Sequence, residues 1–256
     1  MLKQKLIAEA ENTGAECAFV IRNLKTGDSW NYQESRKIKS ASQIKVFVMS
    51  EAVRRVRNGT LALDSEINVD DDDIVPFSVL EFMKPRAYQL EELLRLMIVY
   101  SDNTATNVLI DELGMDRIND CIRDMGFENS VLQRKMMDFE AASAGRENYT
   151  SPAEMAAFMQ RLYDGELIDR KSDAFMLDVM KGQADETMMR DYLPDEITIA
   201  RKSGELDCLD HDIAIVYGTH TDYIYCFFVW NAESNNEARA ALARTSKIVF
   251  DFFEDI

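Results

Sequence analysis

The chain has 256 residues, of which 46% are hydrophobic, and it carries a formal net charge of −17. This length can bury a sizeable core in one large domain or in two small ones. Because the chain is strongly acidic and has no local basic patch, nucleic acid, which is itself polyanionic, is excluded as an expected partner.

No apolar run reaches the roughly 18 residues that are needed to cross a bilayer. The first residues lead into a polar helix and not into the apolar segment of a secretory signal. We therefore expect a monomer without a membrane span that stays in the cytoplasm, or a periplasmic or secreted protein if a leader peptide has been removed.

Hydrophobic periodicity and turn residues predict the elements in chain order. They are a helix over 2–11, strands over 15–22 and 29–32, helices over 44–56, 90–100, 104–113, 115–125, 152–163 and 173–181, strands over 197–203, 212–217 and 222–230, and a helix over 238–253. The helix over 44–56 is apolar on nearly all sides, which indicates that it is buried. Ser40 and Ser42 are residue types that favour its start.

The order of these elements predicts an α/β (α+β) fold. Strands near both ends of the chain must join in one sheet, because an isolated hairpin is only marginally stable. Hairpin connections make the pairing antiparallel. We expect a single domain over 1–256, in which a five-stranded antiparallel sheet flanked by the terminal helices spans about 1–40 and 190–256. An all-helical lobe spans about 41–189.

The start of the buried helix carries a candidate nucleophile. Ser42 and Lys45 are three residues apart, so both lie on one face of the helix, one turn from each other. A free serine is a poor nucleophile and needs a neighbouring base. Burial and a second nearby cation can lower the pKa of a lysine and make it that base. The helix N-terminus also offers backbone N–H groups to an oxyanion.

Two further short motifs fit the same chemistry. Ser101-Asp102-Asn103 lies in the break between two predicted helices, where a hydroxyl can relay a proton and an amide can bind a substrate amide. Lys202-Ser203-Gly204 ends a predicted strand, where the first two residues can bind a carboxylate. Gly204 would let a ligand approach the strand closely. Each motif alone is common as a helix cap, a loop cap or a turn, whereas the ordered set is specific.

Other hydrolytic chemistries have little support. The chain has two histidines, His211 and His220, and no GxSxG motif. It has no HExxH motif and no paired cysteine–histidine spacing for zinc, and no phosphate-binding glycine motif. We therefore expect neither a metal nor an organic cofactor.

With these motifs in order, the sequence resembles the class A β-lactamases, which are penicillin-recognising serine hydrolases. The similar segments are SDNTATNVLIDELG at 101–114, ENYTSPAEMAAFM at 147–159 and KSGELDCLDHDIAIVYG at 202–218. The resemblance implies that Ser42 is the nucleophile and that Lys45 helps to deprotonate it. It also implies that Ser101 passes a proton to the leaving nitrogen, and that Asn103 orients Lys45 and the substrate side chain.

The resemblance further assigns the binding groups. Lys202 and Ser203 would bind the substrate carboxylate, and the backbone N–H groups of Ser42 and Glu205 would form the oxyanion hole. His211 falls where these enzymes often keep a carboxylate-binding arginine. A histidine could bind a carboxylate only weakly, when protonated, so a structural role is the alternative.

The sequence departs from the family at one important place. Class A enzymes have a glutamate in a loop before the segment at 147–159, and this glutamate activates the water that cleaves the acyl-enzyme. In this chain that position falls near Met136 or Met137, where there is no acid. Asp138 and Glu140 are the nearest carboxylates and are the candidate bases, and Glu147 lies further on. If none of them reaches the ester, deacylation would be slow.

Three functions are compatible with this set of residues. The first is a β-lactamase that hydrolyses the lactam amide through an acyl-enzyme on Ser42. The second is a D-alanyl-D-alanine peptidase or an esterase with the same site, acting on an acyl-D-Ala-D-Ala-like substrate. The third is a penicillin-binding module that is acylated and not turned over.

Overall fold

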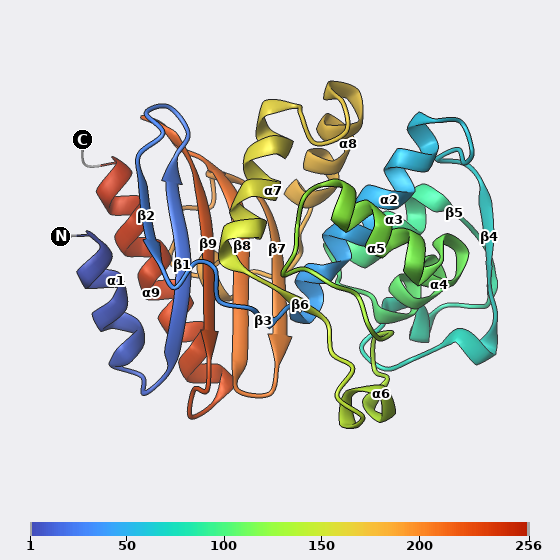
Figure 1. The fold of residues 1–256 in the computed structure, drawn as a ribbon, viewed down its shortest axis with the longest axis horizontal. Helices are drawn as coiled ribbons and strands as arrows, with labels where there is room; N and C mark the ends of the chain where they lie inside the picture. The colour runs from blue at the N-terminus through green and yellow to red at the C-terminus, as the bar shows by residue number, and fades with distance from the viewer. Residues whose placement is uncertain (1, 255–256) are drawn as a thin grey trace.

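A five-stranded antiparallel sheet is the centre of the computed structural model, which describes residues 2–254 (Figure 1). The strand order is β2-β1-β9-β8-β7. The strands are β1 (Glu16–Asn23), β2 (Ser29–Tyr32), β7 (Thr198–Leu206), β8 (Leu209–Tyr217) and β9 (Asp222–Trp230). Strand β1 pairs with β9 along its whole length, which confirms that the two ends of the chain build one sheet.

The two faces of the sheet bury two separate hydrophobic clusters. Helices α1 (Leu2–Glu11) and α9 (Asn235–Glu254) cover one face, where Phe19 and Phe227 stack with ring centroids 4.9 Å apart. Residues alternate between faces along a strand. Val20 and Phe228 therefore belong to the cluster on the other face, which α7 (Pro152–Asp164) covers and which continues into the helical lobe (Figure 1).

The remaining helices form the lobe beside the sheet, as the sequence predicted. They are α2 (Lys45–Arg57), α3 (Leu90–Val99), α4 (Asn103–Leu113), α5 (Met115–Asp124), the short α6 (Phe139–Ser143) and α8 (Arg170–Lys181). Buried α2 packs against α4, α5 and α8. The predicted fold class is thus confirmed: a mixed α/β protein with an antiparallel five-stranded sheet, terminal helices on the sheet and a helical block.

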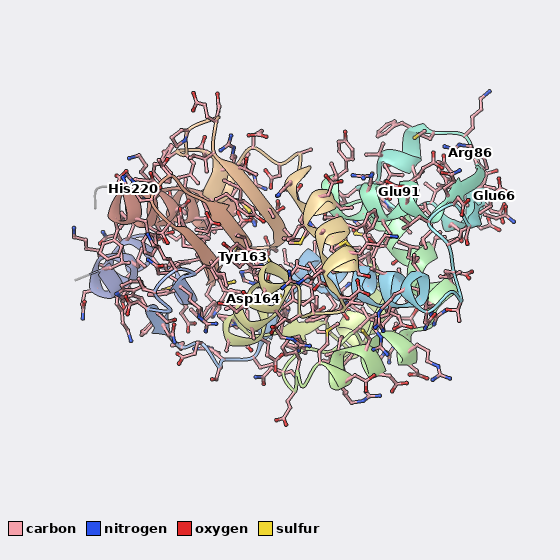
Figure 2. All side chains as sticks on the ribbon, turned by 90° about the horizontal axis from the view of Figure 1, so that it is seen from above. Glu66, Arg86, Glu91, Tyr163, Asp164 and His220 are labelled. Carbon is pink, nitrogen blue, oxygen red and sulfur yellow. The ribbon has the colours of Figure 1, made fainter. Side chains whose placement is uncertain are left out.

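Two small two-stranded sheets were not predicted from the sequence. Strand β3 (Ile38–Lys39) pairs with β6 (Tyr149–Thr150), and β4 (Glu66–Val69) pairs with β5 (Arg86–Gln89). Figure 2 shows Glu66 and Arg86 at the outer end of the helical lobe, far from His220 in the sheet lobe. The β3–β6 pair is the more important one, because it fastens the segment before Ser42 to the loop that ends near Asn148.

The strands that carry the third motif are longer than predicted. Strand β7 continues through Gly204, and β8 begins at Leu209, so Asp207 and Cys208 form a two-residue turn. The predicted strand began at Asp212, whereas β8 already includes Asp210, and both aspartates are fully buried. Asp212 accepts hydrogen bonds from Arg201 Nε and from the backbone N of Met189, and Asp210 Oδ2 accepts one from Asn235 Nδ2. These bonds offset part of the cost of burying the carboxylates.

The start of the buried helix also differs from the prediction. Ser42 lies within a 3-10 turn, Ala41–Ile44, that leads directly into α2, and neither Ser40 nor Ser42 makes a side-chain cap. The hydroxyl of Ser42 is therefore not engaged in capping. None of the helices within residues 2–254 is long and apolar enough to cross a membrane.

Candidate active site

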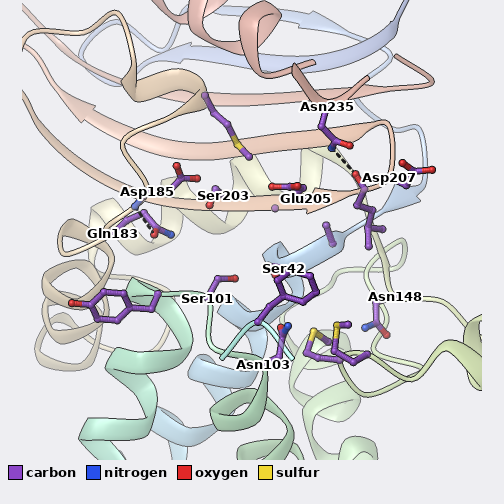
Figure 3. Close-up of a pocket in the computed structure, with 18 of the residues that line it drawn as sticks. Ser42, Ser101, Asn103, Asn148, Gln183, Asp185, Ser203, Glu205, Asp207 and Asn235 are labelled. Carbon is purple, nitrogen blue, oxygen red and sulfur yellow. Dashed lines mark hydrogen bonds between the residues drawn. The ribbon is translucent and has the colours of Figure 1, made fainter. Parts of the chain in front are cut away.

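The motif residues meet in a cavity of about 890 Å³ between the sheet and the helical lobe. Figure 3 shows Ser42 between Ser203 and Glu205 of β7 on one side and Asn103 on the other. The site residues that line the cavity, named above from sequence, are Ser42, Ser101, Asn103, Ser203, Gly204 and Glu205. Lys45 and Lys202 lie beneath this surface and are fully buried.

Strand β7 approaches the 3-10 turn that carries Ser42 very closely. A Cβ atom added to Gly204 would lie 3.2 Å from the backbone N of Ser42 and 3.1 Å from the Cβ of Ala41. Such contacts are tighter than most real Cβ contacts, so neighbouring atoms would have to shift to admit a side chain where the strand passes the turn. Ala41 itself has a left-handed φ of 47°, a conformation that costs free energy for a residue other than glycine.

Lys45 is held by the break between α3 and α4. Its Nζ donates to the backbone O of Ser101 at 2.6 Å, to Ser101 Oγ at 3.1 Å and to Asn103 Oδ1 at 2.9 Å. Burial, and then the nearby charge of Lys202, hold the pKa of Lys45 well below its usual range. Both effects disfavour the ammonium form, so this amine gives up its proton more readily than that of a free lysine.

Ser101 joins the two lysines. Lys202 Nζ also donates to Ser101 Oγ, at 3.1 Å, and to the backbone O of Ser203 at 2.8 Å. Ser101 has a left-handed φ of 56°, and the adjacent Asp102 fixes this turn by accepting from the backbone N of Ala105 and of Leu80. The result is one hydroxyl bonded to two amines that come from distant parts of the chain.

The environment of Lys202 also lowers its basicity. Burial, and then the neighbouring guanidinium of Arg201, lower the pKa of Lys202 to about 7, although the carboxylates of Asp185 and Asp212 act in the opposite direction. Lys202 therefore loses its charge near neutral pH, where a free lysine would keep it.

The structure does not bring His211 to the cavity. Its ring is fully buried, with Nδ1 2.7 Å from the backbone O of Asp210 and Nε2 3.0 Å from that of Lys39, and it packs on Phe228 at 4.3 Å. Burial lowers the pKa of His211 to about 4, although the two backbone carbonyls act in the opposite direction. Both ring nitrogens are occupied by these carbonyls and the ring does not line the cavity, so it is not placed to bind a substrate carboxylate. This corrects the expected binding role and leaves the structural alternative.

The candidate bases Asp138 and Glu140 do not line the cavity either. Asp138 Oδ1 accepts from the backbone N of Ala141 and so caps α6, and Glu140 is exposed on that helix. Asp138 and Glu140 are absent from the cavity lining, whereas other residues of the same loop belong to it: Arg134, Met136, Met137, Phe139, Glu147 and Asn148. The reason is the short helix itself, because its N-cap turns the carboxylates toward its own backbone and toward solvent.

Sequence reasoning missed the ion pair that closes this loop. Arg134 Nε donates to Glu147 Oε1 at 2.7 Å, both side chains are 9% exposed, and both residues line the cavity. Asn148 Oδ1 accepts from the backbone N of Gln133 at 2.7 Å and of Arg134 at 3.1 Å. Two opposite charges 13 residues apart in a loop are only weak evidence for an ion pair, and no other feature of the sequence indicated this one.

Arg239 is a second residue that the sequence analysis missed. It projects from α9 into the cavity wall, forms an ion pair with Glu205 and lies 3.5 Å from Asp210 Oδ1. In the sequence it is one of many charges on an amphipathic helix, which usually indicates a solvated face. Within residues 2–254 there is no group of three histidine, cysteine, aspartate or glutamate side chains that could hold a metal ion.

Known proteins resemble this chain over almost its whole length. The model of the beta-lactamase enzyme family matches residues 1–253. A beta-lactamase of Rhodobacter capsulatus is 28% identical over 236 residues, which cover 90% of this chain and 80% of that protein. Beta-lactamase AER-1 of Aeromonas hydrophila is 24% identical over 208 residues, which cover 79% of this chain and 68% of that protein.

Solved structures agree with the sequence matches. The crystal structure of a beta-lactamase from Sphaerobacter thermophilus has a TM-score of 0.91 and 27% identity, covering 100% of this chain and 97% of that one. The structure of PBP-A has the same TM-score, with 26% identity and coverage of 100% and 96%. A mutant of PBP-A with 26% identity was solved as an acyl-enzyme complex with penicillin G.

Proposed function

Because the chain belongs to the beta-lactamase enzyme family, we propose that it is a serine hydrolase that opens β-lactam rings through an ester on Ser42. The observation that carries the proposal is the Ser101 hydroxyl, which is bonded to both Lys45 and Lys202 beside Ser42 in one cavity. A serine with buried amines of lowered pKa can be acylated without a histidine.

Acylation begins at the Ser42 hydroxyl. Lys45 follows Ser42 by three residues in a continuous helical segment, and its lowered pKa supports a neutral amine that accepts the hydroxyl proton. The Ser42 oxygen then forms a bond to the lactam carbonyl carbon. The backbone N–H groups of Ser42 and Glu205 would stabilise the oxyanion, and the close approach of β7 at Gly204 supports this pairing.

The leaving nitrogen needs a proton when the C–N bond breaks. Ser101 is the candidate donor, because its hydroxyl contacts Lys45 and can be reprotonated from it. The proton lost by Ser42 thus reaches the lactam nitrogen, and Lys45 returns to its neutral form. The product of this step is an ester on Ser42 with the ring opened.

Substrate binding uses the two sides of the cavity. Lys202 and Ser203 are the candidate groups for the carboxylate of a β-lactam, and Arg239 is the further cation in that wall. Asn103 is the candidate for the amide of the acyl side chain. Its Oδ1 is held by Lys45 and its Nδ2 by the backbone O of Pro76, so the amide is fixed before the substrate arrives.

Deacylation is expected to be the slow step. Among the described residues, the carboxylates lining the cavity are Glu147, Asp185, Glu205 and Asp207. Arginines pair with the first three. Met136 and Met137 face the cavity from the loop and cannot activate water. The ester on Ser42 should therefore accumulate during turnover.

The slow deacylation that we expect also favours a second candidate function. An enzyme with a slowly hydrolysed acyl group could instead process a peptide or ester of the acyl-D-Ala-D-Ala type, which shares the carboxylate and the acyl amide. Ser42, Lys45 and Lys202 would have the same roles. The two candidates differ in which substrate gives steady turnover.

One experiment tests acylation and separates the two candidates. The protein is mixed with a chromogenic cephalosporin while colour and intact mass are followed. We expect an early burst of colour, a mass increase on Ser42 and slow steady turnover. Ser42→Ala should give no adduct with an unchanged circular dichroism spectrum, whereas Ser35→Ala, at an exposed serine outside the cavity, should be acylated normally.

An adduct that persists in Ser42→Ala would refute the assignment of the nucleophile. Hydrolysis of an acyl-D-Ala-D-Ala peptide, with an adduct from the cephalosporin that is not turned over, would establish the second candidate instead.

A further inference from the structure

Arg239 has two acidic neighbours, and one of them belongs to the cavity. Its guanidinium forms an ion pair with Glu205 of β7, whose side chain is 49% exposed. Its Nε lies 3.5 Å from Oδ1 of Asp210, whose side chain is fully buried. Arg239 and Glu205 line the cavity, whereas Asp210 does not. One positive charge is therefore shared between two carboxylates before any substrate binds.

The start of α9 holds Arg239 beside the end of β7. Asn235 Nδ2 donates to the backbone O of Leu206 at 2.7 Å and to Asp210 Oδ2 at 2.8 Å, which fastens the first turn of the helix to the sheet (Figure 3). Arg239 follows Asn235 by four residues, so the two side chains lie on the same face of α9. The place of the guanidinium thus follows from the helix and does not depend on Glu205.

The guanidinium of Arg239 retains unused hydrogen-bonding capacity. Within residues 2–254, neither Arg239 Nε nor Asp210 Oδ1 has a hydrogen-bond partner, although both atoms are buried. The described part of the chain gives Arg239 one hydrogen-bond acceptor, the carboxylate of Glu205. Glu205 is therefore the group with which an incoming anion would compete for this guanidinium.

Glu205 also lies close to the position that we expect for the substrate carboxylate. Ser203 and Glu205 are two residues apart on β7, the edge strand of the sheet, so their side chains leave the same face of the strand about 7 Å apart. Figure 3 shows both side chains along one wall of the cavity. A carboxylate bound by Lys202 and Ser203 would thus be repelled by Glu205, and it could gain the charge of Arg239 only by displacing Glu205.

We propose that Glu205 is a specificity-determining residue that competes with the substrate carboxylate for Arg239. The inference rests on the proposed acylation of Ser42 and on the proposed carboxylate site at Lys202 and Ser203. While Glu205 neutralises Arg239, a free carboxylate on the substrate gains little from the guanidinium. The site therefore discriminates between an anionic substrate and its neutral ester less than the same site would without Glu205.

The test compares one penicillin that has a free carboxylate with the methyl ester of the same compound. The second-order rate constants for acylation of Ser42 are measured by rapid quenching and intact mass at about pH 6, where Lys202 is charged because its pKa is about 7. Glu205→Gln keeps the size of the side chain and removes its charge. We expect this variant to raise the ratio of the acid rate to the ester rate by about 5-fold, the upper end of what a partly exposed ion pair contributes.

Asp207→Asn is the matched control. Asp207 is exposed and lines the cavity two residues beyond Glu205, but it forms no ion pair within residues 2–254. The control removes the same charge without releasing a guanidinium, so the ratio should change by less than about 2-fold. Thermal unfolding of each variant verifies that it is folded.

Arg239→Gln supplies a second background for a double-mutant cycle. In this background Glu205→Gln has no guanidinium to release, so it should raise the ratio of the acid rate to the ester rate by less than about 2-fold. An equal rise with and without Arg239 would show that Glu205 acts through its charge alone, and the competition would be refuted.

The remaining outcomes separate this inference from the proposed function. If an adduct forms on Ser42 but Glu205→Gln leaves the ratio unchanged, or raises it no more than Asp207→Asn does, the competition is refuted and the nucleophile keeps its assignment. If the wild-type protein forms no adduct with either compound, the proposed function is overturned, and this inference with it.

Discussion

At the scale of single residues, the site depends on two buried amines with different environments. Lys45 is held near Ser101 and Asn103, and both burial and Lys202 lower its pKa. Lys202 has the nearby carboxylates of Asp185 and Asp212, which partly oppose the effects of burial and Arg201. Two amines in one site favour a single shared proton, so one can serve as base while the other binds an anion.

This arrangement predicts a fall in activity above neutral pH. Lys202 must be charged to bind a carboxylate, and its pKa is about 7. The value of kcat/KM for an anionic penicillin should therefore decrease as pH rises through about 7. The arginine of the Lys202→Arg variant keeps its charge at all these pH values. The decrease in kcat/KM of this variant should therefore occur at a pH at least about one unit higher than in the wild type. The measurement is initial acylation rates between pH 6 and 9.

The acylation rate of Lys202→Arg should be about 10-fold lower than that of the wild type, because a planar guanidinium differs from an ammonium group in shape and hydrogen-bond geometry. Only the pH at which kcat/KM decreases tests whether the charge of Lys202 is required. Lys181→Arg, at an exposed lysine outside the cavity, serves as control and should keep the wild-type profile. An unchanged profile in Lys202→Arg would assign the titration to another group.

At the scale of elements, the loop from Arg134 to Asn148 has methionines at the positions where the family resemblance implied a glutamate. Its ends are joined by the Arg134–Glu147 ion pair and by the Asn148 side chain, and its last residues pair with β3 just before Ser42. The loop thus presents Met136 and Met137 to the cavity from fixed anchors. The β3–β6 pairing couples the loop to the turn that carries the nucleophile.

The buried ion pair predicts a large cost for removing one partner. Arg134→Met leaves the Glu147 carboxylate buried without its counterion, which should reduce the free energy of unfolding by about 3 kcal/mol. For a domain of this size each kcal/mol changes Tm by roughly 2–4 °C, so a drop of about 6–12 °C is expected in thermal unfolding.

Two companion variants define this prediction. Arg134→Met combined with Glu147→Leu removes both charges and should recover most of the lost Tm. Lys135→Met breaks the neighbouring pair with Asp111, whose side chains are 41% and 55% exposed, and should change stability by less than about 0.5 kcal/mol. Equal decreases in Tm for Arg134→Met and Lys135→Met would show that burial does not make the Arg134–Glu147 pair more important for stability than an exposed pair.

At the scale of the whole molecule, the helical lobe and the sheet share one core. The larger hydrophobic cluster contains Phe47 of α2 and Phe158 of α7, whose ring centroids are 5.5 Å apart. The same cluster contains Ile213 and Phe228 of the sheet. Neither lobe buries this surface without the other. We therefore propose that the chain is one folding unit and that its two lobes are parts of a single domain.

A single unfolding transition follows from the shared core. Trp30 and Trp230 both belong to the sheet, so their fluorescence reports on that lobe, whereas circular dichroism at 222 nm reports mainly on the helices. In urea the two signals should give the same midpoint. Separate midpoints would mean that the helical lobe is an independent domain.

The sequence alone determined the longer helices, the five strands of the main sheet and the spacing of the first motif. The apolar periodicity of α2 and the three-residue interval from Ser42 to Lys45 are local, because a helix places such residues on one face whatever surrounds it. The continuous apolar run of β9 was predicted as a strand with its observed bounds, because such a run bounded by turn residues is also a local signal. A family resemblance in three ordered motifs then indicated the chemistry.

Only the tertiary structure decided what depends on distance and burial. It brought Lys202 to the Ser101 hydroxyl across 101 positions, buried His211 away from the cavity, and placed Met136 and Met137, but neither Asp138 nor Glu140, in the cavity lining. These outcomes depend on how the sheet packs against the helical lobe. The pKa of a lysine and the direction of a loop side chain follow from that packing, and no local pattern of residues contains it.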